Sequence, residues 1–95
     1  MKIQNNGFGK EDKIEFPVNF DLKVIMLSVD DPSVSIADLE LLLIQLKIPF
    51  KNWRHKASGK GSYTSFTVNV DIETKILLDK LYLELRTVPG VKMAL

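Results

Sequence analysis

The stretch from Ser58 to Val70 constrains the fold more than any other part of the chain. It opens with a glycine-containing turn and continues, from Ser62 to Val70, with residues that alternate between two faces of different polarity. The apolar side carries Phe66, Val68 and Val70, and the other side carries Tyr63, Ser65, Thr67 and Asn69. Because successive side chains of a strand point to opposite faces, this pattern predicts a half-buried β-strand that follows a hairpin turn.

The size and charge of the chain limit what it can be. With 95 residues it has room for one hydrophobic core, and its formal charge of +1 gives no overall field that would attract nucleic acid or a membrane. There is no cysteine, which excludes disulfides and thiolate chemistry. The longest apolar segment, Leu39 to Leu46, is too short to span a bilayer, and the first residues lack the apolar region of a signal peptide. We therefore expect a cytoplasmic protein.

The first half of the chain predicts a strand followed by a helix. Phe20 to Val29 is apolar on both faces toward its end, which is typical of a central strand. Ser33 or Ser35 is expected to cap a helix that ends by Lys47, since Pro49 cannot continue it. The apolar residues at helical spacing are Ile36, Leu39, Leu42, Leu43 and Leu46.

The second half predicts two strands, a helix and a final strand. Pro49 to Lys56 is weakly apolar and basic, as in an edge strand protected from pairing with other chains. After the strand that ends at Val70, Asp71 or Thr74 is expected to open a helix that Pro89-Gly90 stops. Its inner residues are Ile76 or Leu77, with Leu78, Leu81, Tyr82 and Leu85. Val91, Met93 and Leu95 then alternate as a short strand.

This order of elements predicts a ferredoxin-like βαββαβ sandwich of the α+β class. Two right-handed crossovers around a hairpin give a four-stranded antiparallel sheet with both helices on one face. The two most regular strands then lie in the centre, and the basic strand lies at an edge. Residues 1–13 show no periodicity, so we expect a flexible N-terminal tail before a single domain at residues 14–95.

Three short motifs occur in a fixed order along the domain. They are Glu15-Phe16-Pro17 with Phe20 and Lys23-Val24-Ile25; Ser58 with Lys60-Gly61, Tyr63 and Ser65; and Leu81-Tyr82 with Leu85 and the run from Val91 to Leu95. These motifs resemble the YbeD-like proteins, a bacterial family with a domain of unknown function. The resemblance implies a ferredoxin-like fold similar to the small-molecule-sensing ACT regulatory domains, and it implies no established activity.

The sequence offers no set of residues for catalysis or metal binding. His55 is the only histidine, and the neighbouring cations and absence of a positioned partner favour an exposed edge residue over a general base. With a single histidine and no cysteine, the usual zinc ligand sets are absent. Asp30 and Asp31 could hold magnesium, but a pair that favours a helix N-terminus is the simpler interpretation. We expect a protein that is not an enzyme and has no metal or cofactor.

The turn around Lys60 and Gly61 is the first candidate binding site. Its glycines could turn successive amides toward an anion, although hairpin glycines commonly serve only to supply positive φ angles. Lys60-Gly61 also matches the start of an RNA-binding strand, but Ser62 and Thr64 occupy the positions where stacking aromatic residues are needed. Lys51, Arg54 and Lys56 form a basic patch with Lys60, so weak nucleic-acid binding remains the alternative function.

The open face of the sheet is the second candidate surface. Ile25, Leu27, Tyr63, Ser65 and Thr67 are expected there, and exposed apolar groups tend to mark interfaces, unless the tail or long side chains such as Lys92 cover them.

The function expected from this sequence is that of a non-enzymatic, ACT-like regulatory or adaptor domain that binds a partner protein or a small metabolite. The candidate residues are Lys60, Gly61, Tyr63 and Ser65, joined by Asp31 and Ser33 because the loop after the first strand often meets an effector in ACT-like folds. A homodimer is compatible with this interpretation.

Overall fold

The computed structural model describes residues 15–95, so the tail expected at residues 1–13 lies outside the described part. The elements are β1 (Val18–Leu27), α1 (Pro32–Gln45), β2 (Phe50–Ala57), β3 (Tyr63–Ile72), α2 (Lys75–Leu85) and β4 (Val91–Ala94). Within residues 15–95, no helix combines the length and apolar character needed to cross a bilayer.

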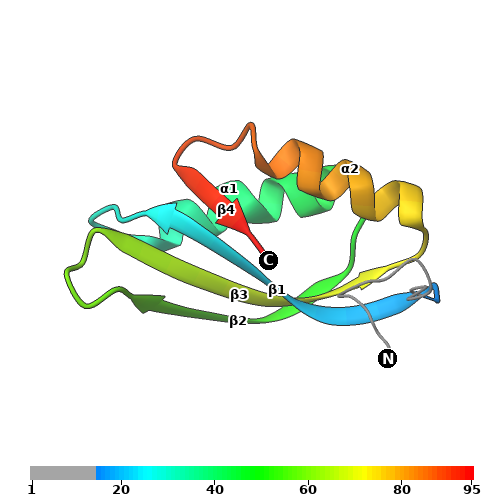
Figure 1. The fold of residues 1–95 in the computed structure, drawn as a ribbon, viewed down its shortest axis with the longest axis horizontal. Coiled ribbons are helices and arrows are strands. Elements are labelled where there is room, and N and C mark those ends of the chain that lie inside the picture. The colour runs from blue at the N-terminus through cyan, green and yellow to red at the C-terminus, as the bar shows by residue number, and fades with distance from the viewer. Residues whose placement is uncertain (1–14) are drawn as a thin grey trace, which may run out of the picture.

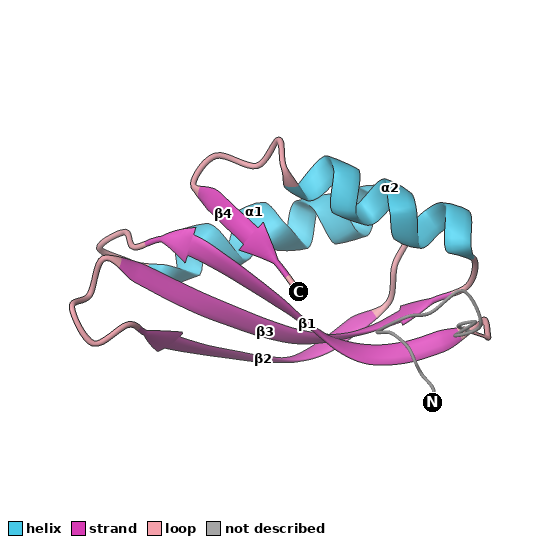
Figure 2. Ribbon diagram, in the orientation of Figure 1, coloured by secondary structure: helices cyan, strands magenta, loops and turns pink. Residues whose placement is uncertain are grey.

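The strands form one antiparallel sheet in the order β2-β3-β1-β4. Both helices pack on the same side of this sheet, and within residues 15–95 the opposite side carries no secondary-structure element (Figures 1 and 2). β1 and β3 occupy the centre, and the basic strand β2 forms an edge. The structure therefore confirms the ferredoxin-like sandwich predicted from the sequence.

The core lies between the sheet and the helices. Leu22, Val24 and Met26 of β1 are buried, while the alternate residues face the open side. β3 follows the same rule with Phe66, Val68, Val70 and Ile72. The helices complete the core with Leu39, Leu42, Leu43, Leu81 and Leu85. The alternation read in the sequence thus corresponds to the two faces of the sheet.

Three predicted boundaries were wrong in detail. β1 ends at Leu27, two residues before Val29. The cap of α1 is Asp31, which accepts a hydrogen bond from the Ser33 amide, and Pro32 takes the first helical position, where its missing N–H costs nothing. Ser33 and Ser35 therefore lie inside the helix instead of capping it. β3 extends to Ile72, which leaves Asp71 in the strand.

Thr74 caps α2, which confirms one of the two alternatives predicted from the sequence. Its hydroxyl oxygen accepts a hydrogen bond from the Leu77 amide at 3.1 Å. On the same helix Ile76 is 80% exposed, so it is Leu77, half-buried, that belongs to the inner side.

A β-bulge at Asn52 controls which way the side chains of β2 point. Lys51 pairs with Asn69 and Arg54 pairs with Thr67, so Asn52 and Trp53 together lie opposite one residue of β3. Asn52 has a φ of 62°, a left-handed conformation that asparagine tolerates better than most residues. Asn52 is therefore the extra residue of the strand.

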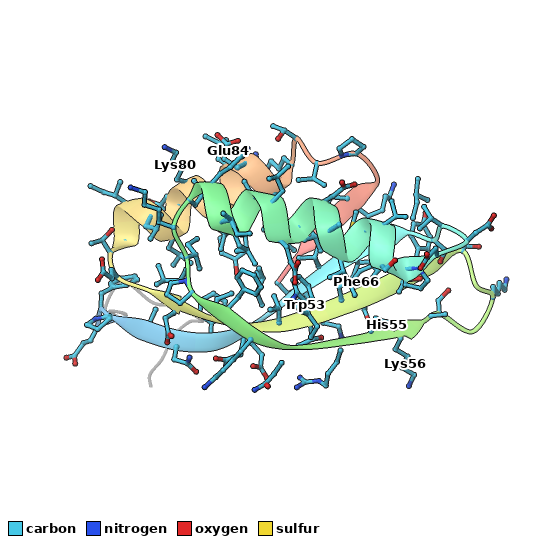
Figure 3. All side chains as sticks on the ribbon, turned by 180° about the vertical axis from the view of Figure 1, so that it is seen from behind. Trp53, His55, Lys56, Phe66, Lys80 and Glu84 are labelled. Atoms are coloured by element: carbon cyan, nitrogen blue, oxygen red, sulfur yellow. The ribbon has the colours of Figure 1, made fainter. Side chains whose placement is uncertain are left out.

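The bulge restores the separation of apolar and basic side chains along β2. Phe50 and Trp53, three residues apart, both pack against the core, with ring centroids 6.1 Å apart in an edge-on arrangement. Their neighbours in the basic patch, Lys51, Arg54 and Lys56, pair with open-face residues of β3. Figure 3 shows Trp53 and Phe66 between the sheet and the helices, with Lys56 on the other side. A strand without the bulge would place these groups on mixed faces.

Candidate functional site

The open face of the sheet presents side chains in cross-strand rows. Leu27 lies beside Tyr63, and the next row places Met93, Ile25, Ser65 and Lys56 side by side across all four strands. The row after that contains Lys23, Thr67 and Arg54. In each row β3 contributes a hydroxyl, and in the second and third rows β2 contributes a cation, while β1 carries Leu27, Ile25 and Lys23 in turn.

A shallow hollow of about 270 Å³ lies on this face beside the β2–β3 hairpin. We call it the hairpin hollow, and its lining residues are Lys23, Ile25, Lys56, Ala57, Ser58, Gly59, Tyr63 and Ser65. Its two charged residues are both lysines and stand on different strands: Lys56 pairs with Ser65, and Lys23 pairs with Thr67, the next open-face residue of β3. A carboxylate or phosphate is the kind of group that such a lining can bind.

The turn that borders the hollow is held by backbone hydrogen bonds. The Ser58 amide donates to the Tyr63 carbonyl at 2.7 Å, and the Gly61 amide donates to the Ser58 carbonyl at 2.9 Å. Gly61 adopts a φ of 74°, which favours glycine. The Gly61 amide is thus used within the turn, and neither Lys60 nor Gly61 is among the residues that line the hollow.

The loop between β1 and α1 is tied to the same hairpin. The Ser28 amide donates to the Ser62 carbonyl at 3.0 Å, and the hydroxyls of Ser28 and Thr64 lie 2.8 Å apart. Thr64 is buried on the helix-facing side of β3, so this hydroxyl pair satisfies a polar group in the core. The contact fixes the end of the hairpin, and with it the wall of the hollow, relative to β1.

Replacing Thr64 by valine should lower the free energy of unfolding by about 1 kcal/mol, because the Ser28 hydroxyl loses its partner. The double variant Ser28→Ala/Thr64→Val should recover most of this loss, since neither polar group is then left unpaired. Urea denaturation of wild type, Ser28→Ala, Thr64→Val and the double variant measures both effects. A double variant less stable than the sum of the two single changes would contradict the pairing.

Asp31 and Ser33 are not brought into the hollow. Asp31 caps α1, where its carboxylate accepts from both the amide and the hydroxyl of Ser33, at 3.0 and 2.9 Å. These hydrogen bonds, the amide first, hold the pKa of Asp31 below its usual value. The two residues explain the start of a helix, and the lining of the hairpin hollow does not include them.

Part of the basic patch is neutralised at the far end of the open face. Arg54 forms an ion pair with Asp21 at 3.3 Å, and the side-chain Nδ2 of Asn69 donates to the other carboxylate oxygen of Asp21 at 3.0 Å. The Asn69 hydrogen bond and then the Arg54 contact lower the pKa of Asp21. Asn19 joins this network through Asn69 and Asp71. Lys23 and Lys56, the two cations that line the hairpin hollow, form no ion pair within residues 15–95.

His55 faces the opposite side of the sheet. It pairs with Phe66 in the register of β2 and β3, with ring centroids 6.0 Å apart, and remains exposed at the edge of the helix-facing side. Figure 3 shows Lys56, the next residue along the strand, on the other side of the sheet. Within residues 15–95 there is no group of three or more histidine, aspartate or glutamate side chains placed to hold a metal ion.

β4 extends the open face beside β1, as the predicted sandwich requires, but its residues were not among the candidate site residues from the sequence. The Lys23 amide donates to the Leu95 carbonyl at 3.1 Å, and Met93 pairs with Ile25. Met93 is 50% exposed and Leu95 61%, and with Leu27 they form an apolar margin beside the hollow. The predicted topology gives the neighbour of β4 but not its register, so Met93 and Leu95 were missed as site residues. Lys23 was missed because its place beside the hollow depends on the register of β1 with β3.

Solved structures place this fold in the ACT-like class. The ACT domain from a GTP pyrophosphokinase of Chlorobium tepidum superimposes with a TM-score of 0.63, covering 83% of this chain and 96% of that domain at 10% identity. The solution structure of protein HP0495 from H. pylori is more similar, with a TM-score of 0.71, 21% identity and coverage of 99% and 98%. Both similarities concern the fold.

The family is defined by sequence. Residues 11–95 match the family described as "Protein of unknown function (DUF493)". A UPF0250 protein of Shewanella woodyi is 34% identical over 86 residues, covering 90% of this chain and 93% of the relative. A UPF0250 protein of Shewanella loihica is 36% identical over 83 residues, with coverage of 86% and 90%. The chain belongs to this family, in agreement with the YbeD-like resemblance.

Proposed function

We propose that the protein is a non-enzymatic, ACT-like regulatory domain that binds a small anionic metabolite in the hairpin hollow. The observation that carries this proposal is that one hollow is lined by two lysines on different strands, Lys23 and Lys56, together with the Ser65 hydroxyl and the apolar groups of Ile25 and Tyr63. A ligand with a carboxylate or phosphate at one end and an apolar body would complement both parts of the surface.

The chemistry of the hollow supports binding more than catalysis. Its lining contains neither a carboxylate nor an imidazole that could act as a general base, and its hydroxyls belong to Ser58, Tyr63 and Ser65. The Ser65 hydroxyl donates to the Lys56 carbonyl, and Ser58 accepts from the Tyr63 amide, so neither serine lies beside an activating base. Lysines and hydroxyls in this arrangement recognise an anion without transforming it.

A thermal-shift panel of carboxylates, phosphates, amino acids and nucleotides tests the proposal. A compound that prefers the folded protein must raise its melting temperature. For a compound that does so, Lys56→Ala should weaken binding by about tenfold, since a hydrogen bond to a charged group contributes about 1.5–3 kcal/mol.

Lys80→Ala is the matched control, because Lys80 is exposed on α2, away from the sheet (Figure 3). Equal binding by wild type and Lys56→Ala would rule out the hollow as the site. If no compound in the panel raises the melting temperature, a metabolite site is contradicted, and a partner protein becomes the ligand to seek.

Weak nucleic-acid binding is the second candidate function. The bulge at Asn52 favours it, because Lys51, Arg54 and Lys56 share the open face with Lys23. About four phosphate contacts would give a slope of roughly −3 to −4 in a plot of log affinity against log salt concentration. A short RNA should then raise the melting temperature at low salt and lose its effect at moderate salt, whereas a metabolite held partly by apolar contacts should act at both.

A further inference from the structure

The outer side of α1 carries an apolar stripe that the fold leaves uncovered. Val34, Leu41 and Ile44 are 55%, 57% and 60% exposed, and Ala37 between them is also exposed. Their spacing of three, four and three residues is the spacing of the seam in a coiled coil. The core of the domain uses the other side of the helix, through Leu39, Leu42 and Leu43. The stripe is therefore a second apolar face of the same helix.

A groove adjoins this stripe and widens the surface. It has a volume of about 290 Å³ and runs between α1 and the end of α2. Leu41 belongs to both the stripe and the groove, whose other lining residues are Asp38, Leu42, Gln45, Glu84, Thr87, Val88 and Pro89. The two helices lie side by side on the sheet, with α1 nearer the viewer in Figure 3. An apolar side chain beside Leu41 could thus enter the groove.

The charged residues that flank the stripe within α1, and those that line the groove, are all acidic. The residues that flank it along α1 are Ser33 and Glu40 on one side and Asp38 and Gln45 on the other. Glu84 adds a third carboxylate across the groove, and within residues 15–95 none of these three acids forms an ion pair. In paired helices the flanking positions select the partner by charge. These acids therefore favour a partner with basic flanking residues.

We propose that the stripe and groove on α1 dock a basic amphipathic helix of another protein. Apolar residues of that helix would cover Val34, Ala37, Leu41 and Ile44, and its lysines or arginines would face Asp38 and Glu40. A second copy of α1 fits this surface poorly, because it would bring acidic flanks against acidic flanks. The surface lies on the helical layer, on the other side of the sheet from the hairpin hollow, so the two sites are independent.

Two synthetic peptides of about three heptads test the proposal with the full chain. Both carry leucine at the seam positions, and one carries lysine at the flanking positions where the other carries glutamate. Fluorescence anisotropy should show that the lysine peptide binds at least about tenfold more tightly than the glutamate peptide. Equal binding of the two peptides, or binding of neither, would overturn the proposal.

Matched variants place the binding on α1. Leu41→Ser/Ile44→Ser should weaken the binding of the lysine peptide by about tenfold or more. Leu83→Ser changes a residue of α2 that is 61% exposed and should leave the binding unchanged. Asp38→Lys/Glu40→Lys should reverse the preference in favour of the glutamate peptide. Binding of the lysine peptide that survives the Leu41/Ile44 change would overturn the proposal. It would also be overturned if the wild-type protein self-associates in sedimentation and the Leu41/Ile44 change abolishes this, because a second copy would then be the occupant.

Discussion

Replacing Phe66 by alanine is expected to lower the free energy of unfolding by about 3–5 kcal/mol. Phe66 is 1% exposed and lies on the helix-facing side of the central strand β3. Removing its ring takes away a large apolar contact area and leaves a cavity that the sheet and helices can close only in part. Because domains of this size are stable by about 5–15 kcal/mol, the loss is a large share of the total. Urea denaturation followed by circular dichroism measures it.

Two variants control for the change of residue. Phe66→Leu keeps most of the apolar volume, so it should lower the free energy of unfolding by less than half as much as Phe66→Ala does. Leu83→Ala removes a side chain that is 61% exposed, so its effect should stay within about 0.5 kcal/mol. A Phe66→Ala protein within 1 kcal/mol or so of wild type would mean that Phe66 is not part of the core.

The central strands were predictable because their pattern is local. In β1 and β3 one face packs on the helices and the other meets solvent, so burial alternates residue by residue and the sequence alternates with it. The helix limits depended on single hydrogen bonds. Asp31 caps α1 because its carboxylate reaches the Ser33 amide, a choice between neighbouring polar residues that apolar spacing does not decide.

The candidate site was predictable only in part, because it depends on pairing between distant strands. Tyr63 and Ser65 were expected on the open face from the alternation of β3, and they line the hairpin hollow. Lys23 reaches the same hollow through the pairing of β1 with β3, and Met93 lies beside it through the pairing of β4 with β1. Register between strands is fixed by the folded sheet as a whole, so local sequence gives little sign of it.

The basic strand β2 had the least regular pattern of apolar residues in the sequence, and its bulge explains why. With Phe50 and Trp53 three residues apart, no regular strand can bury both. Asn52, at a φ of 62°, adds the residue that brings both rings to the core and the three cations to the open face. The bulge thus connects an irregular sequence to the electrostatics of the candidate site.

Deleting Asn52 should therefore leave the protein folded, whereas deleting Thr67 from the neighbouring strand should unfold it. Without Asn52, Trp53 alone lies opposite Val68, while Phe50, Lys51 and Arg54 keep their partners on β3. The strand becomes regular with every side chain on its present face, so we expect a cost of no more than about 1–3 kcal/mol for local repacking.

Thr67 has no such freedom, because β3 is a central strand without a bulge in its pairing with β1. Its deletion turns one half of β3 over and expels either Phe66 or the group Val68, Val70 and Ile72 from the core. Expelling Val68, Val70 and Ile72 costs about 1.5–3 kcal/mol for each side chain, which approaches the whole stability of a domain of this size. Expelling Phe66 would in addition turn the polar Ser65 toward the core. Trp53 is the only tryptophan, so its emission reports the outcome directly. For the Asn52 deletion we expect blue-shifted Trp53 emission in the folded protein and a cooperative unfolding transition. For the Thr67 deletion we expect neither. If both deletions unfold the protein alike, Asn52 is not the extra residue of β2, and the alignment of Lys51 with Arg54 and Lys56 on the open face needs another cause.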